Sequence, residues 1–129
     1  MEKDSQKISP NLEMYLETIL LLSKKNGEAR ITDIAAEMNV AKSSVHIAMH
    51  TLSDKGFLKQ EKYGAVNLTE SGKAYAADIY SRHELLTAFF IDVIGVDTAT
   101  AEKDACAIEH IISAEAIEKI KGIMKERKN

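Results

Sequence analysis

Two short amphipathic segments joined by only three residues, 39–41, limit more than any other feature how this chain can fold. In the first segment Ile34, Ala35 and Met38 lie on one face of a helix. In the second segment four apolar residues recur at spacings of three, four and seven: Val45, Ala48, Met49 and Leu52. Two helices joined by so short a turn are typical of a helix-turn-helix.

Patterns on either side add a third helix and a hairpin. Ser9-Pro10 predicts the start of a helix over residues 10–25, because serine is a good N-cap and proline suits the first helical position. Residues 57–61 and 65–68 carry alternating apolar side chains, which predicts a two-stranded hairpin. Helix, helix, turn, helix and hairpin, in that order, predict a winged helix-turn-helix.

Helical patterns fill the rest of the chain. A long helix is expected over residues 70–94, with Thr69 as its N-cap and Gly95 as its stop. Another is expected from Asp97 or Thr98 to about residue 112, and Ser113 caps a last helix.

We therefore expect a mainly α fold with two domains: a winged helix-turn-helix of three helices and a two-stranded wing over residues 1–75, and a helical domain over residues 76–129. The formal net charge is −3. The first 75 residues carry ten basic and ten acidic side chains, and the remainder carries seven basic and ten acidic ones. The acidic excess thus lies in the second domain, where a bound divalent cation would offset it.

Composition excludes several other classes of protein. Hydrophobic residues make up 45% of the 129 residues, and no apolar run approaches the roughly 20 residues that cross a bilayer. The first ten residues are charged and lack the hydrophobic segment of a signal peptide. With one cysteine, Cys106, no intrachain disulfide can form, and we expect a cytoplasmic protein.

The helix that follows the turn of residues 39–41 has an exposed face that predicts DNA binding. Residues 40–53 contain none of the 20 acids of the chain. Hydroxyls near a helix N-terminus suit phosphates, and imidazole and aliphatic groups suit base edges. The alternative is that these residues form an ordinary solvent-exposed helix face. The negative net charge weakens the prediction of DNA binding but does not exclude it. The predicted DNA contacts are Lys42, Ser43, Ser44, His46, Ile47, His50 and, in the wing, Lys62.

Ligand-type side chains recur at helical spacing in the first helix, the long helix and the helix that follows it. Seven residues form this set: Met14, Glu17, His83, Glu102, Cys106, Glu109 and His110. Imidazole, carboxylate and sulfur together suit a first-row transition metal. Each residue also has a purely structural interpretation, because methionine and cysteine often fill cores and histidine often lies in an interior with its hydrogen bonds satisfied.

The chain resembles the diphtheria-toxin-repressor family of iron- and manganese-dependent regulators, in a short form without an SH3-like domain. The resemblance runs from about Pro10 to Ile120 and rests on these motifs: LEMYLE (12–17), ITDIA (31–35), VAKSSV (40–45), GAVNLTESG (64–72), RHELL (82–86), IGVD (94–97) and CAIEH (106–110). It implies a homodimer whose affinity for operator DNA rises when a divalent metal docks the first helix onto the dimerisation helices.

By position, the resemblance also implies site residues. Four resemble the activating site of iron-type members: Met14, Cys106, Glu109 and His110. Three resemble the companion site of manganese-type members: Glu17, His83 and Glu109. The chain departs from the iron-type pattern at Glu17, where those members have a basic residue, and at Thr87 and Glu102, where they have a carboxylate and a histidine. It departs from the manganese-type pattern at Met14 and Cys106, where those members have carboxylates. Its sulfur ligands favour Fe²⁺, with Mn²⁺ next.

Two other regulators are compatible with the residues: a winged helix that senses thiol oxidation at Cys106, and one that senses a small molecule without metal. An enzyme is not expected, because the chain offers no recognisable nucleophile, phosphate loop or paired-acid site beyond the proposed ligands. We therefore expect a metal-dependent repressor with double-stranded operator DNA and a second copy as partners, and with neither a membrane nor a small-molecule substrate. Four apolar residues are expected in the shared dimer core: Leu85, Phe89, Phe90 and Ile111.

Overall fold

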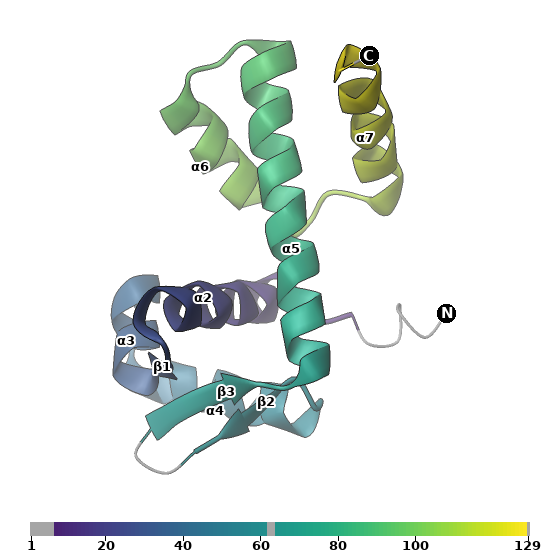
Figure 1. The fold of residues 1–129 in the computed structure, drawn as a ribbon. Helices are drawn as coiled ribbons and strands as arrows, with labels where there is room; N and C mark the ends of the chain where they lie inside the picture. Colours follow the sequence, from purple (N-terminus) through teal and green to yellow (C-terminus); the bar gives the residue numbers. More distant parts are fainter. Residues whose placement is uncertain (1–6, 62–63, 129) are drawn as a thin grey trace. The chain divides into compact units, whose positions relative to one another are not determined.

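The computed structural model describes residues 7–61 and 64–128, and the predicted DNA contact Lys62 lies outside them. The chain divides into two units, Met1–Ala77 and Asp78–Asn129. The first unit contains, in order, α2 (Pro10–Asn26), β1 (Ala29–Arg30), α3 (Ile31–Met38), α4 (Lys42–Asp54), β2 (Leu58–Gln60) and β3 (Ala65–Leu68) (Figure 1). The helix α5 (Glu70–Phe89) begins in the first unit and continues into the second, which also contains η2 (Phe90–Ile94), α6 (Thr98–Ile108) and α7 (Ala114–Lys128).

This order confirms the predicted mainly α fold with a winged helix-turn-helix. The helix α2 begins as expected, because the Ser9 side chain accepts a hydrogen bond from the backbone N–H of Leu12 at 3.2 Å and Pro10 follows it. The turn between α3 and α4 bends at Asn39, whose φ of 56° is left-handed. Asparagine tolerates that conformation better than most residues, so the short turn costs little strain.

The wing differs from the prediction by one strand. The hairpin of β2 and β3 forms as expected, with Leu58 opposite Leu68, but β1 also pairs with β3 and makes a three-stranded antiparallel sheet. A strand of two residues is too short to show alternation, so no sequence pattern predicted its pairing with β3. This pairing keeps Arg30 extended, and α3 starts at Ile31. Thr32 therefore lies within the first turn of α3 and does not cap it.

Hydrogen bonds connect the start of α5 to the residues that follow α4. Thr69 caps the helix as predicted, since its Oγ1 accepts from the N–H of Gly72 at 3.1 Å, and the same hydroxyl donates to the carbonyl of Gly56 at 2.7 Å. A Cβ on Gly72 would lie 1.9 Å from the carbonyl oxygen of Phe57. Only glycine fits at this crossing. Around it the first unit closes on an aliphatic core in which the largest fully buried members are Leu16, Ile19, Ile34, Met49, Leu52 and Leu58.

In the second unit the long helix changes its winding before it ends. Helical structure reaches Ile94 as predicted, but residues 90–94 form a π-helix that ends at Gly95, where φ is 89°. Asp97 caps α6 through the N–H of Thr100. The helix α6 ends at Ile108, four residues earlier than expected. Ser113 caps α7 as predicted, and the core consists of Leu86, Ala105 and Ile117 with partly buried Leu85, Phe90, Ile108, Ile112 and Ile120.

No helix within residues 7–61 and 64–128 is both long and apolar enough to cross a membrane.

Candidate metal centre and nucleic-acid interface

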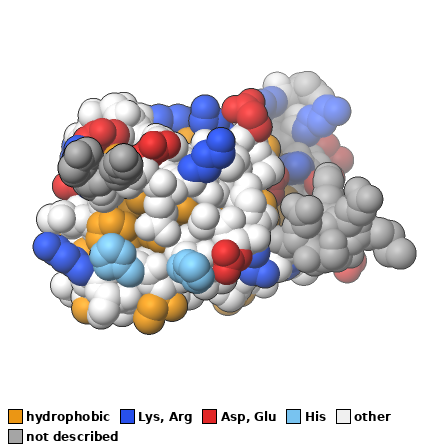
Figure 2. All heavy atoms as spheres, turned by 90° about the horizontal axis from the view of Figure 1, so that it is seen from below, with side chains coloured by type: hydrophobic (Ala, Val, Ile, Leu, Met, Phe, Trp, Pro, Cys, Tyr) orange, Lys and Arg blue, Asp and Glu red, His pale blue; other side chains and the backbone are white. Residues whose placement is uncertain are grey.

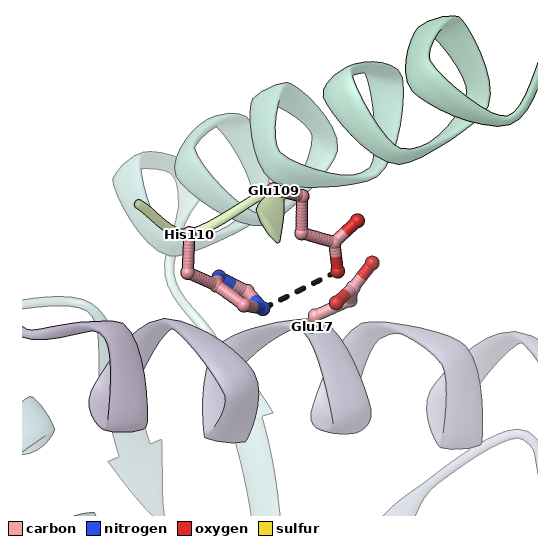
Figure 3. Close-up of side chains that lie close together, drawn as sticks. All are labelled: Glu17, Glu109 and His110. Atoms are coloured by element: carbon pink, nitrogen blue, oxygen red, sulfur yellow. Dashed lines mark ion pairs between the residues drawn. The ribbon is translucent and has the colours of Figure 1, made fainter. Parts of the chain in front are cut away.

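The second unit holds a carboxylate between two imidazoles. Glu109, the C-terminal cap of α6, has no solvent-exposed surface. One carboxylate oxygen, Oε2, lies 2.8 Å from Nδ1 of His83 on α5, and the other, Oε1, lies 3.2 Å from Nε2 of His110. Figure 3 shows the pair formed by Glu109 and His110 as a dashed line. A buried carboxylate needs such partners because removing its charge from water is costly.

His83 bridges two carboxylates. Its second ring nitrogen, Nε2, lies 2.9 Å from Oε2 of Glu102 on α6. Burial alone would lower the pKa of His83, but the hydrogen bond and charge of Glu102 and the charge and hydrogen bond of Glu109 outweigh it and raise that pKa above 6.5. The ring also stacks on Tyr80, with centroids 6.0 Å apart. His83 is therefore held on both edges and one face.

The backbone that carries Glu109 is held as well. The guanidinium of Arg82, on α5 next to His83, donates to the carbonyl oxygen of Glu109 at 2.8 Å. Sequence reasoning did not identify Arg82 as part of the site. The only signal was its position beside His83 in the motif RHELL, because a contact 27 residues away leaves no local pattern.

Within the second unit, the structure brings together four of the seven predicted ligands: His83, Glu102, Glu109 and His110. Two imidazoles and two carboxylates are ligands that manganese, iron and zinc accept. Cys106 lies on α6, one turn before Glu109 and His110, with an exposed side chain. Thr87, which stands where iron-type members have a carboxylate, donates a hydrogen bond to the carbonyl of His83.

The other two predicted ligands, Met14 and Glu17, lie one turn apart on α2 in the first unit. Their neighbour Glu13 is only 1% exposed and accepts a hydrogen bond of 2.7 Å from the hydroxyl of Tyr75 on α5. The same hydroxyl accepts from the N–H of Ile8 at 3.1 Å. Glu13 and Tyr75 therefore anchor α2 and were missed by sequence reasoning. An acid on the apolar stripe of α2, three residues before Leu16, was the available signal.

The faces of α4 are those that its periodicity predicted. The buried residues are Val45, Ala48, Met49 and Leu52, and the exposed ones include Lys42, Ser43, Ser44, His46, Ile47 and His50. Figure 2 shows two histidine side chains near each other on the face in view, with lysine or arginine, acidic and hydrophobic side chains close by. His50 lies 3.6 Å from Asp54 at the far end of the helix. This exposed face remains a predicted DNA contact.

Family profiles match both parts of the chain. The profile described as iron dependent repressor, N-terminal DNA binding domain, matches residues 7–66. The profile described as iron dependent repressor, metal binding and dimerisation domain, matches residues 69–129. Together they cover nearly all of the chain.

Curated relatives agree with these profiles. An uncharacterised HTH-type transcriptional regulator of Methanocaldococcus jannaschii is 32% identical over 95% of this chain and 98% of its own length. The HTH-type transcriptional regulator MntR of Shouchella clausii is 38% identical over 91% of this chain and 81% of its own length.

Solved structures share the fold. The crystal structure of IdeR from T. acidophilum has a TM-score of 0.78 and 26% identity, and covers 88% of this chain and 53% of its own. A hypothetical protein from Sulfolobus solfataricus has a TM-score of 0.71 and 26% identity, with coverages of 92% and 91%. The chain spans about half the length of IdeR and of several other solved regulators that it matches.

Proposed function

The chain belongs to the iron-dependent repressor family, and we propose that it represses transcription by binding operator DNA as a homodimer with a divalent metal as co-repressor. Members of this family are metal-dependent transcriptional regulators and not enzymes, which confirms that the chain is not an enzyme. Fe²⁺ is the metal we favour, and Mn²⁺ is the next candidate.

One observation carries this proposal: the buried carboxylate of Glu109 lies between the imidazoles of His83 and His110. Metal ligands of these types must be a carboxylate anion and neutral imidazoles. In the metal-free chain, a hydrogen bond from His83 and an ion-pair contact with His110 hold the carboxylate of Glu109 in place. A bound cation would supply a positive charge next to the buried carboxylate of Glu109. Glu102 would then orient His83 from its far nitrogen, as carboxylates commonly orient metal-bound histidines.

The remaining ligands connect the metal to the DNA-binding unit. We propose that Met14 and Glu17 on α2 complete the site together with Cys106, so that binding fixes α2 relative to the second unit. Metal shifts this arrangement only by its difference in affinity for the two states. A coupling of about 1–3 kcal/mol would change operator affinity about 5- to 150-fold.

The donor set bears on which metal is bound. Thioether and thiolate sulfur, from Met14 and Cys106, soften the site and favour Fe²⁺ over Mn²⁺. The carboxylates and imidazoles alone would suit Mn²⁺ equally well, and the 38% identical relative is called MntR, so Mn²⁺ stays the alternative.

DNA binding is proposed for the exposed face of α4, together with Lys62 of the wing. Two copies of a helix-turn-helix read two half-sites about one helical turn apart, so a dimer is expected on the operator. Apolar residues of the second unit are available for this dimer, including Phe90 and the 69% exposed Ile111.

A second candidate function is supported by the exposure of Cys106. An exposed thiol can be oxidised, so the chain would then sense peroxide rather than metal. Peroxide would change the DNA affinity of the metal-free protein, and Cys106→Ser would abolish that change. Under the metal proposal, the metal-free protein does not respond to peroxide.

The deciding experiment measures DNA binding of the full chain, without oxygen, in the presence of Fe²⁺, Mn²⁺, Zn²⁺ or a chelator. The DNA is an operator selected from random duplexes by the full chain. We expect Fe²⁺ or Mn²⁺ to raise the affinity for this operator about 5- to 150-fold over the affinity in chelator. Glu109→Gln keeps the size of the side chain but removes its charge, and should lose this increase. Glu118→Gln is the matched control, because that carboxylate is exposed and pairs only with Lys121 among the described ion pairs. Equal responses in both variants would refute the site.

A further inference from the structure

Ile47 is an apolar side chain in a polar surface. It leaves 70% of its surface exposed, whereas the other exposed large apolar residues described in the first unit, Met14, Leu21 and Val40, leave 41% or less. A single exposed isoleucine is ordinary on a protein surface. Its position distinguishes this one, because it lies midway along α4, within the residues 40–53 that contain no acid.

The exposed side of α4 that contains Ile47 is long enough to contact a few base pairs. Ser43, Ile47 and His50 lie on the side of α4 opposite its buried residues. At 1.5 Å per residue, Ser43 and His50 are about 10 Å apart along the helix axis, which spans about three base pairs. Ile47 lies between two side chains that can form hydrogen bonds, so the middle of this surface is its only apolar part.

The major groove offers one apolar partner for such a side chain. Thymine carries a C5 methyl group there, whereas the other bases present hydrogen-bond donors and acceptors. Against those polar edges Ile47 would leave buried groups without hydrogen bonds, which costs affinity. The helix α4 contains no arginine, asparagine or glutamine, so among the usual readers of guanine and adenine it carries only Lys42, its first residue.

We propose that Ile47 determines operator specificity by contacting the methyl group of a thymine in each half-site. This inference rests on the proposed function, in which α4 enters the major groove. It states that one position of each half-site is a thymine and that the C5 methyl group of this thymine is the group that Ile47 contacts. Lys42 and the serines beside it contribute affinity for phosphates and not this preference.

The test begins with selection of operator sequences from random duplexes by the full chain with Mn²⁺ or, without oxygen, Fe²⁺. Each thymine of the selected site is then replaced in turn by deoxyuridine, which removes only the methyl group. We expect one position in each half-site at which this change weakens binding about fourfold, the size of one lost methyl contact. In Ile47→Ala the same replacement should have no effect.

Two further variants separate specificity from general affinity. Ile47→Val keeps part of the contact and should show a smaller loss on deoxyuridine than the wild type. Lys42→Gln should weaken binding to every sequence alike and keep the full deoxyuridine effect. Leu21→Ala, an exposed apolar change on α2, is the control for surface hydrophobicity and should leave both quantities unchanged.

The outcomes separate this inference from the proposed function. If metal-dependent binding selects an operator but no thymine methyl matters, or if it matters equally in Ile47→Ala, the inference is wrong and the repressor proposal stands. If no metal produces sequence-selective binding, the repressor proposal fails and this inference fails with it.

Discussion

The Nδ1 atom of His83 lies 2.8 Å from Oε2 of Glu109, and this contact joins α5 to the end of α6 across 26 residues of sequence. Glu109 uses its other oxygen for His110, and His83 uses its other nitrogen for Glu102. The four side chains form one chain of alternating carboxylates and imidazoles. The raised pKa of His83 favours its protonated form, whereas a metal-bound imidazole must be neutral, so metal binding at His83 would release that proton.

The first prediction is that the metal-free protein loses stability as pH rises above about 6.5, the ordinary pKa of a histidine. The pKa of His83 is raised in the folded chain, so folding favours its protonated form. That stabilisation is complete below the pKa of the unfolded chain and disappears as pH rises through the raised value. Urea unfolding in chelator, monitored by circular dichroism, measures it.

His83→Gln should flatten this dependence over the same pH range. His50→Gln is the matched control, because His50 is exposed on α4 and its partner Asp54 is exposed too. A pH dependence that survives in His83→Gln would assign it to another group.

The second prediction concerns the sulfur of Cys106. Replacing the thiol by a hydroxyl hardens the ligand set, so Cys106→Ser should lower the affinity for Fe²⁺ relative to Mn²⁺ by about tenfold. Competition between the two metals under anaerobic conditions measures the ratio. Ala107→Ser, at the adjacent exposed position of α6, should leave it unchanged. An unchanged ratio in Cys106→Ser would remove Cys106 from the ligand set.

A third prediction addresses the anchor of α2. Tyr75→Phe removes the hydroxyl that donates to the buried Glu13 and should lower the free energy of unfolding by about 1–3 kcal/mol. Chemical denaturation gives the value. Ser81→Ala removes an exposed hydroxyl that donates to the carbonyl of Asp78, and should change stability by less than about 0.5 kcal/mol. Similar losses in the two variants would show that burial of Glu13 adds nothing.

The fourth prediction compares two glycines. Gly72→Ala places a Cβ 1.9 Å from the carbonyl oxygen of Phe57, so we expect a loss of about 3 kcal/mol or failure to fold. Gly122→Ala, within α7 and with no atom within 4 Å of the new Cβ, should instead raise stability by up to about 1 kcal/mol. Thermal unfolding of both proteins decides it, and a tolerated Gly72→Ala would mean that the wing and α5 can separate.

The sequence by itself determined the features that depend on neighbouring residues. The spacing of Val45, Ala48, Met49 and Leu52 identified the buried face of α4, and Ser9, Thr69 and Ser113 were predicted as helix caps that the structure confirms. These features follow from helical periodicity and from hydrogen bonds between residues three apart. Such features can be predicted from the sequence because the interacting groups are close together along the chain.

Only the tertiary structure decided which residues distant in the sequence come into contact. The contacts of Glu109 with His83 and of Glu13 with Tyr75 join residues 26 and 62 positions apart, and the pairing of β1 with β3 joins Ala29 to Val66. Nothing local distinguishes a buried carboxylate from an exposed one until the helices pack. A buried charge without a partner is energetically costly, so the folded structure is one in which the carboxylates of Glu13 and Glu109 have partners.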